Sequence, residues 1–201
     1  MERQSLIFAT GNKGKLKEAG EILGEKFEVI GAAAAGFTEE VEETGQSFQD
    51  NALLKSRALY DALGKDCFSD DSGLEVDALD GAPGIYSARY AGEDKDFECN
   101  IDKVLSQMEG KTDRRARFRC CVSLIWKGER YFFDGKLEGE IGYARKGHNG
   151  FGYDPIFIPD WVAPGVANTE RLTLAEISAE DKNRISHRAE ALFLLSEFLN
   201  A

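Results

Sequence analysis

The sequence has 201 residues, of which 42% are hydrophobic, and a formal net charge of −11 from 36 acidic and 25 basic side chains. A chain of this size can bury a substantial core, so we expect one domain over residues 1–201, with two lobes and no separable linker. The acidic balance argues against a nucleic-acid partner, because phosphate backbones are bound by clustered Lys and Arg. No signal peptide or membrane span is recognisable, which predicts a cytoplasmic protein without a membrane partner.

The four cysteines are Cys67, Cys99, Cys120 and Cys121, and none belongs to a C-x-x-C motif. In a reducing compartment such thiols are usually buried packing residues. We therefore prefer packing over a zinc or redox site.

The N-terminal part predicts a strand, a glycine-containing loop and a helix. Ser5 to Ala9 forms an apolar run typical of a buried strand, and apolar side chains recur with helical spacing from about Lys15 to Leu23. Phe27 to Ile30 predicts a second strand, and Ala32 to Gly45 an acidic loop.

The next elements are a long helix and a strand that ends in acidic residues. Phe48 to Leu63 predicts the helix, whose inward face we expect to carry Leu53, Leu54, Ala58 and Leu63. Asp66 to Ser69 predicts a strand that ends at Asp70–Asp71–Ser72–Gly73.

The middle of the chain has an antiparallel character. Leu74 to Leu79 alternates with period two, a turn-rich loop follows around Pro83, and Asp96 to Met108 predicts a helix. Hairpin and strand signals then follow at Arg115–Trp126, Arg130–Phe133 and Glu138–Ala144.

The C-terminal part predicts one helix that starts at Ser178 and continues to about Leu199. Crossover and hairpin connections then occur in the same chain. The sequence therefore predicts an α/β fold with a mixed β-sheet and flanking helices.

A candidate phosphate-binding loop lies between the first strand and the first helix. It comprises Thr10, Gly11, Asn12, Lys13, Gly14 and Lys15. Glycines let backbone N–H groups approach an anion, the helix dipole favours negative charge, and Lys adds a full positive charge. The segment matches neither a Walker A loop nor a dinucleotide fingerprint, and an ordinary turn is the alternative.

Two acidic segments are candidate metal ligands. Glu42 and Glu43 lie in one loop, and Asp70, Asp71 and Ser72 follow an apolar strand. Adjacent carboxylates after a buried strand are costly unless a cation or hydrogen bonds compensate, and such oxygen ligands suit Mg²⁺. A turn and a solvated acidic loop are the alternatives.

Basic and aromatic side chains supply further candidates for ligand binding. Lys55 lies on the long helix, and Lys182, His187 and Arg188 lie on the last predicted helix. Two rigid donors at His187 and Arg188 could recognise a planar ligand edge, and the aromatics of Phe151–Gly152–Tyr153–Asp154 could stack on a base. Each of them alone is also compatible with solvation or packing.

In their joint order these segments resemble the inosine/xanthosine triphosphate pyrophosphatase family, the house-cleaning nucleotide hydrolases. The matching motifs span nearly the whole chain and are Ala9–Asn12 with Lys15, Glu42–Gly45, Asn51–Ala52 with Lys55, Asp70–Leu74, Gly81–Tyr90, Phe151–Pro155, and Lys182 with Ser186–Arg188. The resemblance implies an elongated α/β fold with two lobes around a central substrate cleft, and a homodimer. It also implies Mg²⁺-dependent cleavage of ITP, dITP or XTP between the α and β phosphates.

The same resemblance assigns roles to particular residues. Asp71 is expected to be the general base and a Mg²⁺ ligand, with Glu42 as a further ligand and Ser72 near the substrate. A cation beside Asp71 should keep the pKa of this carboxyl low. The loop residues 10–15, Lys55 and Lys182 are expected to face the triphosphate, and residues 151–154 with His187 and Arg188 to hold the base.

The chain departs from the family pattern in two places. His148 and Asn149 precede Gly150 where the family often has a run of glycines, and the stretch 160–172 looks longer than usual. Two alternatives to the purine enzyme remain open. They are the related septum-inhibitor-type pyrophosphatases, which prefer pyrimidine or modified nucleotides, and a nucleotide sensor without turnover.

Overall fold

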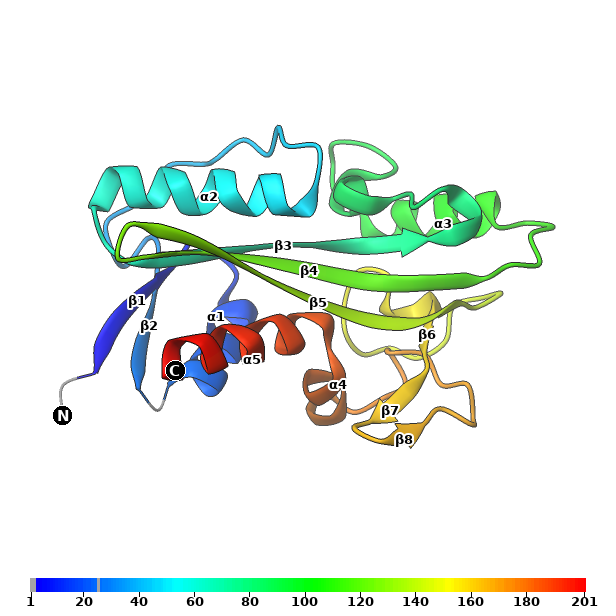
Figure 1. The fold of residues 1–201 in the computed structure, drawn as a ribbon. Coiled ribbons are helices and arrows are strands. Elements are labelled where there is room, and N and C mark those ends of the chain that lie inside the picture. The colour runs from blue at the N-terminus through cyan, green and yellow to red at the C-terminus, as the bar shows by residue number, and fades with distance from the viewer. Residues whose placement is uncertain (1–2, 25) are drawn as a thin grey trace. The chain divides into compact units, whose positions relative to one another are not determined.

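The computed structural model describes residues 3–24 and 26–201, and its main element is a six-stranded sheet (Figure 1). The strands lie in the order β2-β1-β3-β4-β5-β6, with bounds β1 Gln4–Phe8, β2 Phe27–Gly31, β3 Cys67–Val76, β4 Arg115–Trp126, β5 Glu129–Ile141 and β6 Phe157–Pro159. Strand β1 pairs in parallel with β2 and β3, whereas β5 and β6 are antiparallel. The predicted mixed sheet is therefore confirmed.

Five α-helices accompany the sheet in the described part of the chain: α1 Lys13–Leu23, α2 Phe48–Leu63, α3 Phe97–Gln107, α4 Ala179–Ile185 and α5 His187–Asn200. Short 3₁₀ turns cover Asp77–Leu79, Gly84–Arg89 and Asp154–Ile156. Among these described helices, none combines the length and the apolar character that crossing a membrane requires.

The chain divides into two compact units, and β3, β4 and β5 contribute residues to both. Unit 1 comprises residues 1–71, 120–135 and 188–201, and unit 2 comprises residues 72–119 and 136–187.

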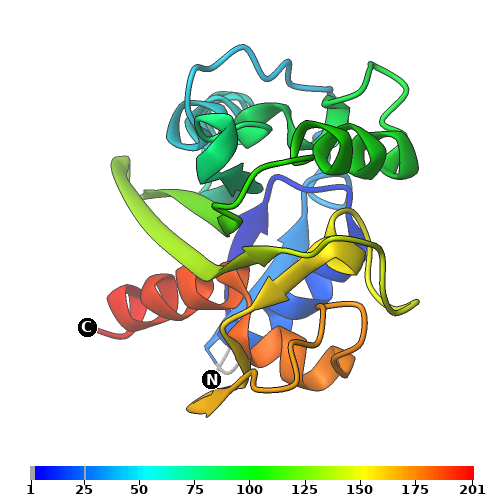
Figure 2. The same ribbon diagram turned by 90° about the vertical axis from the view of Figure 1, so that its right-hand side faces the viewer.

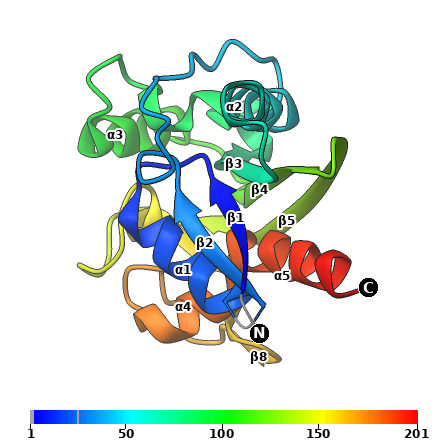
Figure 3. The ribbon, with the colours of Figure 1, turned by 90° about the vertical axis from the view of Figure 1, so that its left-hand side faces the viewer.

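In unit 1 the sheet is covered on both faces (Figures 1 and 3). Helices α1 and α5 pack on one face, where Leu6 and Phe8 of β1 point, and α2 packs on the other, where Ile7 points. This alternation is the period-two pattern of a strand that is buried on both sides. The strand β1 ends at Phe8, so the loop Thr10–Lys15 begins at the carboxyl end of this parallel part of the sheet.

In unit 2 one continuous hydrophobic core contains residues of α3, of the strands and of the segment that contains α4. Figure 2 shows the backbone of these elements. Ile101 and Val104 of α3 are buried in this core, as is Met108 directly after this helix. Phe118 and Phe157 belong to the same core, with ring centroids 4.7 Å apart. The stretch 160–172, which the sequence marked as atypical, contains the small hairpin β7 Trp161–Ala163 and β8 Val166–Ala167.

Three boundary predictions are wrong. The strand predicted over Asp66–Ser69 and the start of the alternating stretch Leu74–Leu79 belong to one strand, β3, which ends at Val76, so the acidic pair lies within it. The predicted strands 130–133 and 138–144 belong to one long strand, β5, which ends at Ile141. The single C-terminal helix is interrupted at Ser186, whose extended backbone (ψ 148°) separates α4 from α5. Apolar periodicity did not reveal this interruption, because the pattern continues across it.

The helix α2 has the predicted bounds, and its inward face agrees with the prediction in part, because Ala58 and Leu63 pack against the core. Its buried residues are Phe48, Asn51, Ala52, Ser56 and Leu59, whereas Leu54 is exposed. Asn51 and Ser56 are polar, so a count of apolar residues cannot assign them to the core. The expectation for the cysteines holds for Cys67, Cys120 and Cys121, which are buried, and fails for Cys99, which is exposed.

Candidate active site

The predicted phosphate loop lies at the N-terminus of α1 in unit 1. Asn12 caps this helix, because its Oδ1 accepts hydrogen bonds from the N–H groups of Gly14 (2.8 Å) and Lys15 (3.1 Å). The hydroxyl of Thr10 accepts from the N–H of Asn12 in turn. Gly11, Asn12, Lys13 and Gly14 are exposed. The loop thus presents backbone donors and lysines at a helix N-terminus, where an anion is favoured.

Lys15 points toward the acidic pair on β3. Its Nζ donates to both carboxylate oxygens of Asp70, at 2.9 and 2.7 Å, and Asp70 is 2% exposed. The same carboxylate accepts from Nε of Arg188 at 3.2 Å, and the Arg188 guanidinium also contacts Glu18 at 2.9 Å. A chain of alternating charges therefore joins α1, β3 and the start of α5 inside unit 1.

These contacts lower the pKa of the Asp70 carboxyl group. Burial alone would raise the pKa of Asp70, but Lys15, Arg188 and Lys55 outweigh it and hold the pKa well below its usual range. Burial likewise opposes the charge on Arg188, yet Asp70 and Glu18 raise the pKa of this guanidinium. Asp70 is thus an ionised carboxylate at neutral pH and forms ion pairs with Lys15 and Arg188. A base contact by Arg188 stays a prediction.

Asp71 is surrounded by side chains of α2 and of the acidic loop. Nδ2 of Asn51 donates to Oδ2 of Asp71 at 3.0 Å, and Nζ of Lys55 lies 3.8 Å from its Oδ1. Lys55 also pairs with Glu43. The sequence singled out Lys55 and Asp71 but gave no role to Asn51, whose amide needs the folded backbone to find its partners.

Burial raises the pKa of Asp71 above its ordinary value, and Glu43 and Asp70 add to this, against Lys55 and Asn51. Burial thus outweighs the single lysine, and the low pKa expected for Asp71 beside a bound cation stays a prediction. For Lys55, burial lowers the pKa, but Asp71, Asp70 and Glu43 outweigh it and raise the pKa. A carboxylate with a raised pKa is a better proton acceptor.

The predicted Mg²⁺ ligands fit the chemistry of this ion. Asp71 is buried among carboxylates that disfavour its charge, so a bound cation would relieve the repulsion. Glu42 is exposed, and its neighbour Glu43 is the residue that contacts Lys55. Within residues 3–24 and 26–201, no three His, Cys, Asp or Glu side chains converge on one point. Mg²⁺ typically keeps several waters and uses one or two carboxylates plus substrate phosphates, so a full protein cage is not required.

The predicted base-binding segment lies in unit 2 and is organised by Asp154. The Asp154 carboxylate is 3% exposed, accepts from the N–H of Phe151 at 2.8 Å and forms an ion pair with Lys182. Nζ of Lys182 also lies 4.6 Å from the centroid of the Phe151 ring, which is 62% exposed. An exposed aromatic face beside an ammonium donor is suited to a planar, oxygen-bearing ligand.

The other predicted residues of unit 2 have different surroundings. Tyr153 is buried and its hydroxyl donates to the carbonyl of Ser87 at 2.8 Å, which is a packing role. His187 is half-buried and stacks on Phe118, with ring centroids 5.1 Å apart. Ser72 is half-buried and follows Asp71 along β3.

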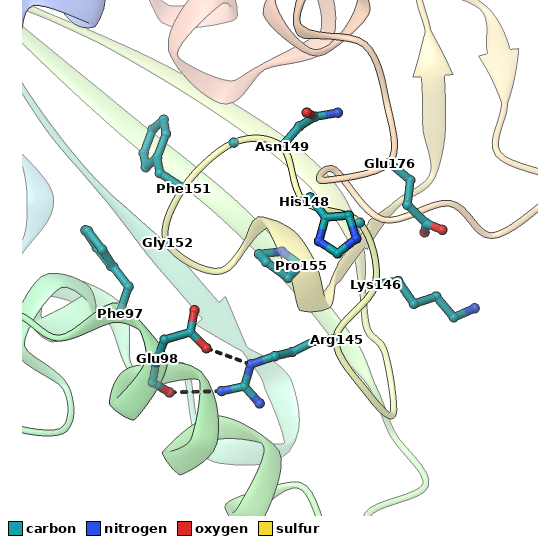
Figure 4. A pocket seen from close by; sticks show the side chains of 12 residues that line it. Phe97, Glu98, Arg145, Lys146, His148, Asn149, Phe151, Gly152, Pro155 and Glu176 are labelled. Carbon is teal, nitrogen blue, oxygen red and sulfur yellow. Dashed lines mark hydrogen bonds and ion pairs between the residues drawn. The ribbon is translucent and has the colours of Figure 1, made fainter.

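A pocket of about 830 Å³ lies in unit 2 between the start of α3 and the loop 145–152 (Figure 4). Phe151 and Gly152 line it, as do His148 and Asn149, the two residues at which the chain departs from the glycine-rich family pattern. Arg145, which the sequence did not single out, is fixed by Glu98 (3.1 Å) and Asp102 (2.7 Å) beside this pocket.

The fold is α/β, with a glycine- and lysine-containing loop and an acidic centre in unit 1 and an exposed aromatic side chain beside Lys182 in unit 2. Residues 6–198 match the model of the Ham1 family. The chain is 48% identical to the dITP/XTP pyrophosphatase of Bacillus subtilis (strain 168), over 97% of this chain and 96% of that protein. It is 44% identical to the enzyme of the same name from Porphyromonas gingivalis, over 98% and 97%.

Solved structures of Ham1 proteins are similar to this chain along almost its whole length. The Staphylococcus aureus Ham1 protein superposes with a TM-score of 0.88 at 44% identity, and a HAM1 protein from Coxiella burnetii with 0.89 at 36% identity, each over 98% of both chains. The chain therefore belongs to the Ham1 family.

Proposed function

We propose that this protein is a Mg²⁺-dependent nucleoside triphosphate pyrophosphatase that acts on non-standard purine nucleotides such as dITP, ITP and XTP. The observation that carries the proposal is the end-to-end similarity to dITP/XTP pyrophosphatases. The products are a nucleoside monophosphate and pyrophosphate. A single domain, a cytoplasmic location and a homodimer belong to the same proposal.

The residues of unit 1 supply the chemistry. Lys15, Lys55 and the N-terminus of α1 bind the triphosphate, whose charge an acidic protein accepts only at such a local basic site. The carboxylate of Asp71 takes a proton from water as the water oxygen bonds to the α-phosphorus. The bond from this phosphorus to the bridging oxygen breaks, and pyrophosphate leaves with the bonding electrons. Asp71 and Glu42 would hold the Mg²⁺, which would neutralise phosphate charge and stabilise the leaving group.

The residues of unit 2 recognise the purine base of the nucleotide. We assign Lys182, for which the sequence predicted a contact with the triphosphate, to the base, because it lies next to the exposed ring of Phe151. Its ammonium has three N–H donors and no acceptor, and the ion pair with Asp154 leaves donors for a ligand. A 6-oxo purine accepts from such a donor, whereas the 6-amino group of adenine leaves it unpaired, which a polar site penalises strongly. We expect His187 to contribute to the same recognition.

A panel of nucleotides tests this function. With Mg²⁺ present, we expect kcat/KM for dITP and XTP to exceed that for dATP by at least about 100-fold, since a mispaired polar site costs this much. Monophosphate production is measured for dITP, XTP, dATP, dGTP, dCTP and dTTP. Equal rates for all six would contradict the purine specificity. A preference for dCTP or dTTP would favour the septum-inhibitor-type alternative, and binding without turnover would favour a sensor.

A further inference from the structure

One buried amide, that of Asn51, connects two chain segments of the candidate active site. Asn51 lies in the first turn of α2 and is 0% exposed. Its Oδ1 accepts a hydrogen bond from the N–H of Gly45 at 2.8 Å, and its Nδ2 donates to Oδ2 of Asp71 at 3.0 Å. The backbone N–H can only donate and a carboxylate can only accept, so the two partners fix the orientation of the amide.

The acidic loop approaches Asn51 very closely. A Cβ atom at Gly45 would lie 2.6 Å from Cβ of Asp50 and 2.7 Å from Oδ1 of Asn51, so a side chain at this position requires the loop to move. The start of α2 is itself fixed by Ser47, whose hydroxyl accepts from the N–H of Asp50 at 3.1 Å. The Glu42–Gly45 loop is therefore packed closely against the capped first turn of α2.

Lys55 lies one turn after Asn51 on the same face of α2. The two side chains approach different oxygens of the Asp71 carboxylate, since Asn51 contacts Oδ2 and Lys55 lies near Oδ1. Both also hold the acidic loop, Asn51 at Gly45 and Lys55 at Glu43. Helix α2 thus sets the orientation of the Asp71 carboxylate and the position of the loop that carries Glu42.

We propose that Asn51 is a positioning residue that couples the Glu42–Gly45 loop to the carboxylate of Asp71, so that acids from both segments bind one divalent cation. The inference rests on the proposed function for the roles of Asp71 and Glu42. Neutral hydrogen-bond partners that orient metal-binding carboxylates commonly change metal affinity or activity by about 10–100-fold when they are removed.

The test compares Asn51→Leu with Ser56→Ala. Ser56 is a suitable control because it is 0% exposed on the same helix and its hydroxyl forms hydrogen bonds with Ser123 and with the carbonyl of Leu53. Mn²⁺ binding to the protein without nucleotide is measured by electron paramagnetic resonance, and kcat and KM are measured with dITP. For Asn51→Leu we expect Mn²⁺ affinity and kcat each to fall by about 10–100-fold, with KM changed by less than about threefold because the phosphate lysines remain. Ser56→Ala should lower only the melting temperature.

Gly45→Ala provides a second variant in case Asn51→Leu does not fold, because it displaces a surface loop and leaves the core intact. We expect the same losses of Mn²⁺ affinity and kcat. Wild-type Mn²⁺ affinity and kcat in either folded variant overturn the inference, and so does an equal loss in Ser56→Ala. If the wild-type protein hydrolyses no nucleotide, the proposed function fails, while the Mn²⁺ titration still decides the role of Asn51.

Discussion

Asp71→Asn should reduce kcat/KM for dITP by about 10²–10⁴-fold, the usual contribution of a general base. The substitution keeps the shape of the side chain and its hydrogen bond from Asn51, but it removes the proton acceptor and one metal ligand. The fold should survive, because the carboxyl of Asp71 carries a burial cost in the folded state that raises its pKa.

The matched control is Asp61→Asn. Asp61 is an exposed carboxylate on α2 that pairs with Arg57, so its substitution should leave kcat/KM unchanged. Steady-state kinetics and thermal melting of both variants decide the outcome. Full activity of folded Asp71→Asn would eliminate the proposed base.

Asp70→Ala should destabilise the protein by about 3–5 kcal/mol, because breaking a buried ion pair leaves a charge without compensation. Here the removal affects both Lys15 and Arg188. For a chain of this length the melting temperature should fall by roughly 6–20 °C. Asp61→Ala, which removes an exposed pair, should cost about 0–1 kcal/mol. Equal melting temperatures of Asp70→Ala and Asp61→Ala in EDTA would contradict the role of Asp70 as an anchor.

The difference in melting temperature between wild type and Asp70→Ala should become smaller as the pH falls. The folded-state pKa of Asp70 is lowered, so its stabilising contribution is fully present above its unfolded pKa of about 3.9. The contribution is lost as the pH falls from there through the folded-state pKa. Wild type and Asp70→Ala should therefore differ most in melting temperature near neutral pH and converge in acid.

Local patterns predicted much of the fold. The strand before Thr10, the helix Phe48–Leu63 and the hairpin around Lys127 follow from apolar periodicity and turn chemistry. The turn at Lys127 and Gly128 has positive φ at both residues, as a tight hairpin requires. The continuation of β3 past Asp71 could not be predicted in the same way, because acidic residues within a strand are tolerated only when partners from other segments compensate them.

The candidate active site, too, could be predicted only in part, because some of its residues depend on contacts that the fold creates. Residue type and family resemblance selected Lys15, Lys55 and Asp71, and these residues do meet carboxylate or cationic partners in unit 1. Asn51 received no role, since its importance comes from two hydrogen bonds to residues six and twenty positions away. The sequence predicts a ligand contact for Arg188, and only the folded chain shows its ion pairs with Asp70 and Glu18.

The identity of the products tests the central claim most directly. ³¹P nuclear magnetic resonance of dITP incubated with the protein and Mg²⁺ should show inorganic pyrophosphate and dIMP appearing in equal amounts, and no turnover when EDTA replaces the metal. Formation of dIDP and orthophosphate would contradict cleavage between the α and β phosphates, and undiminished hydrolysis in EDTA would contradict the acidic centre at Asp71 as a metal site.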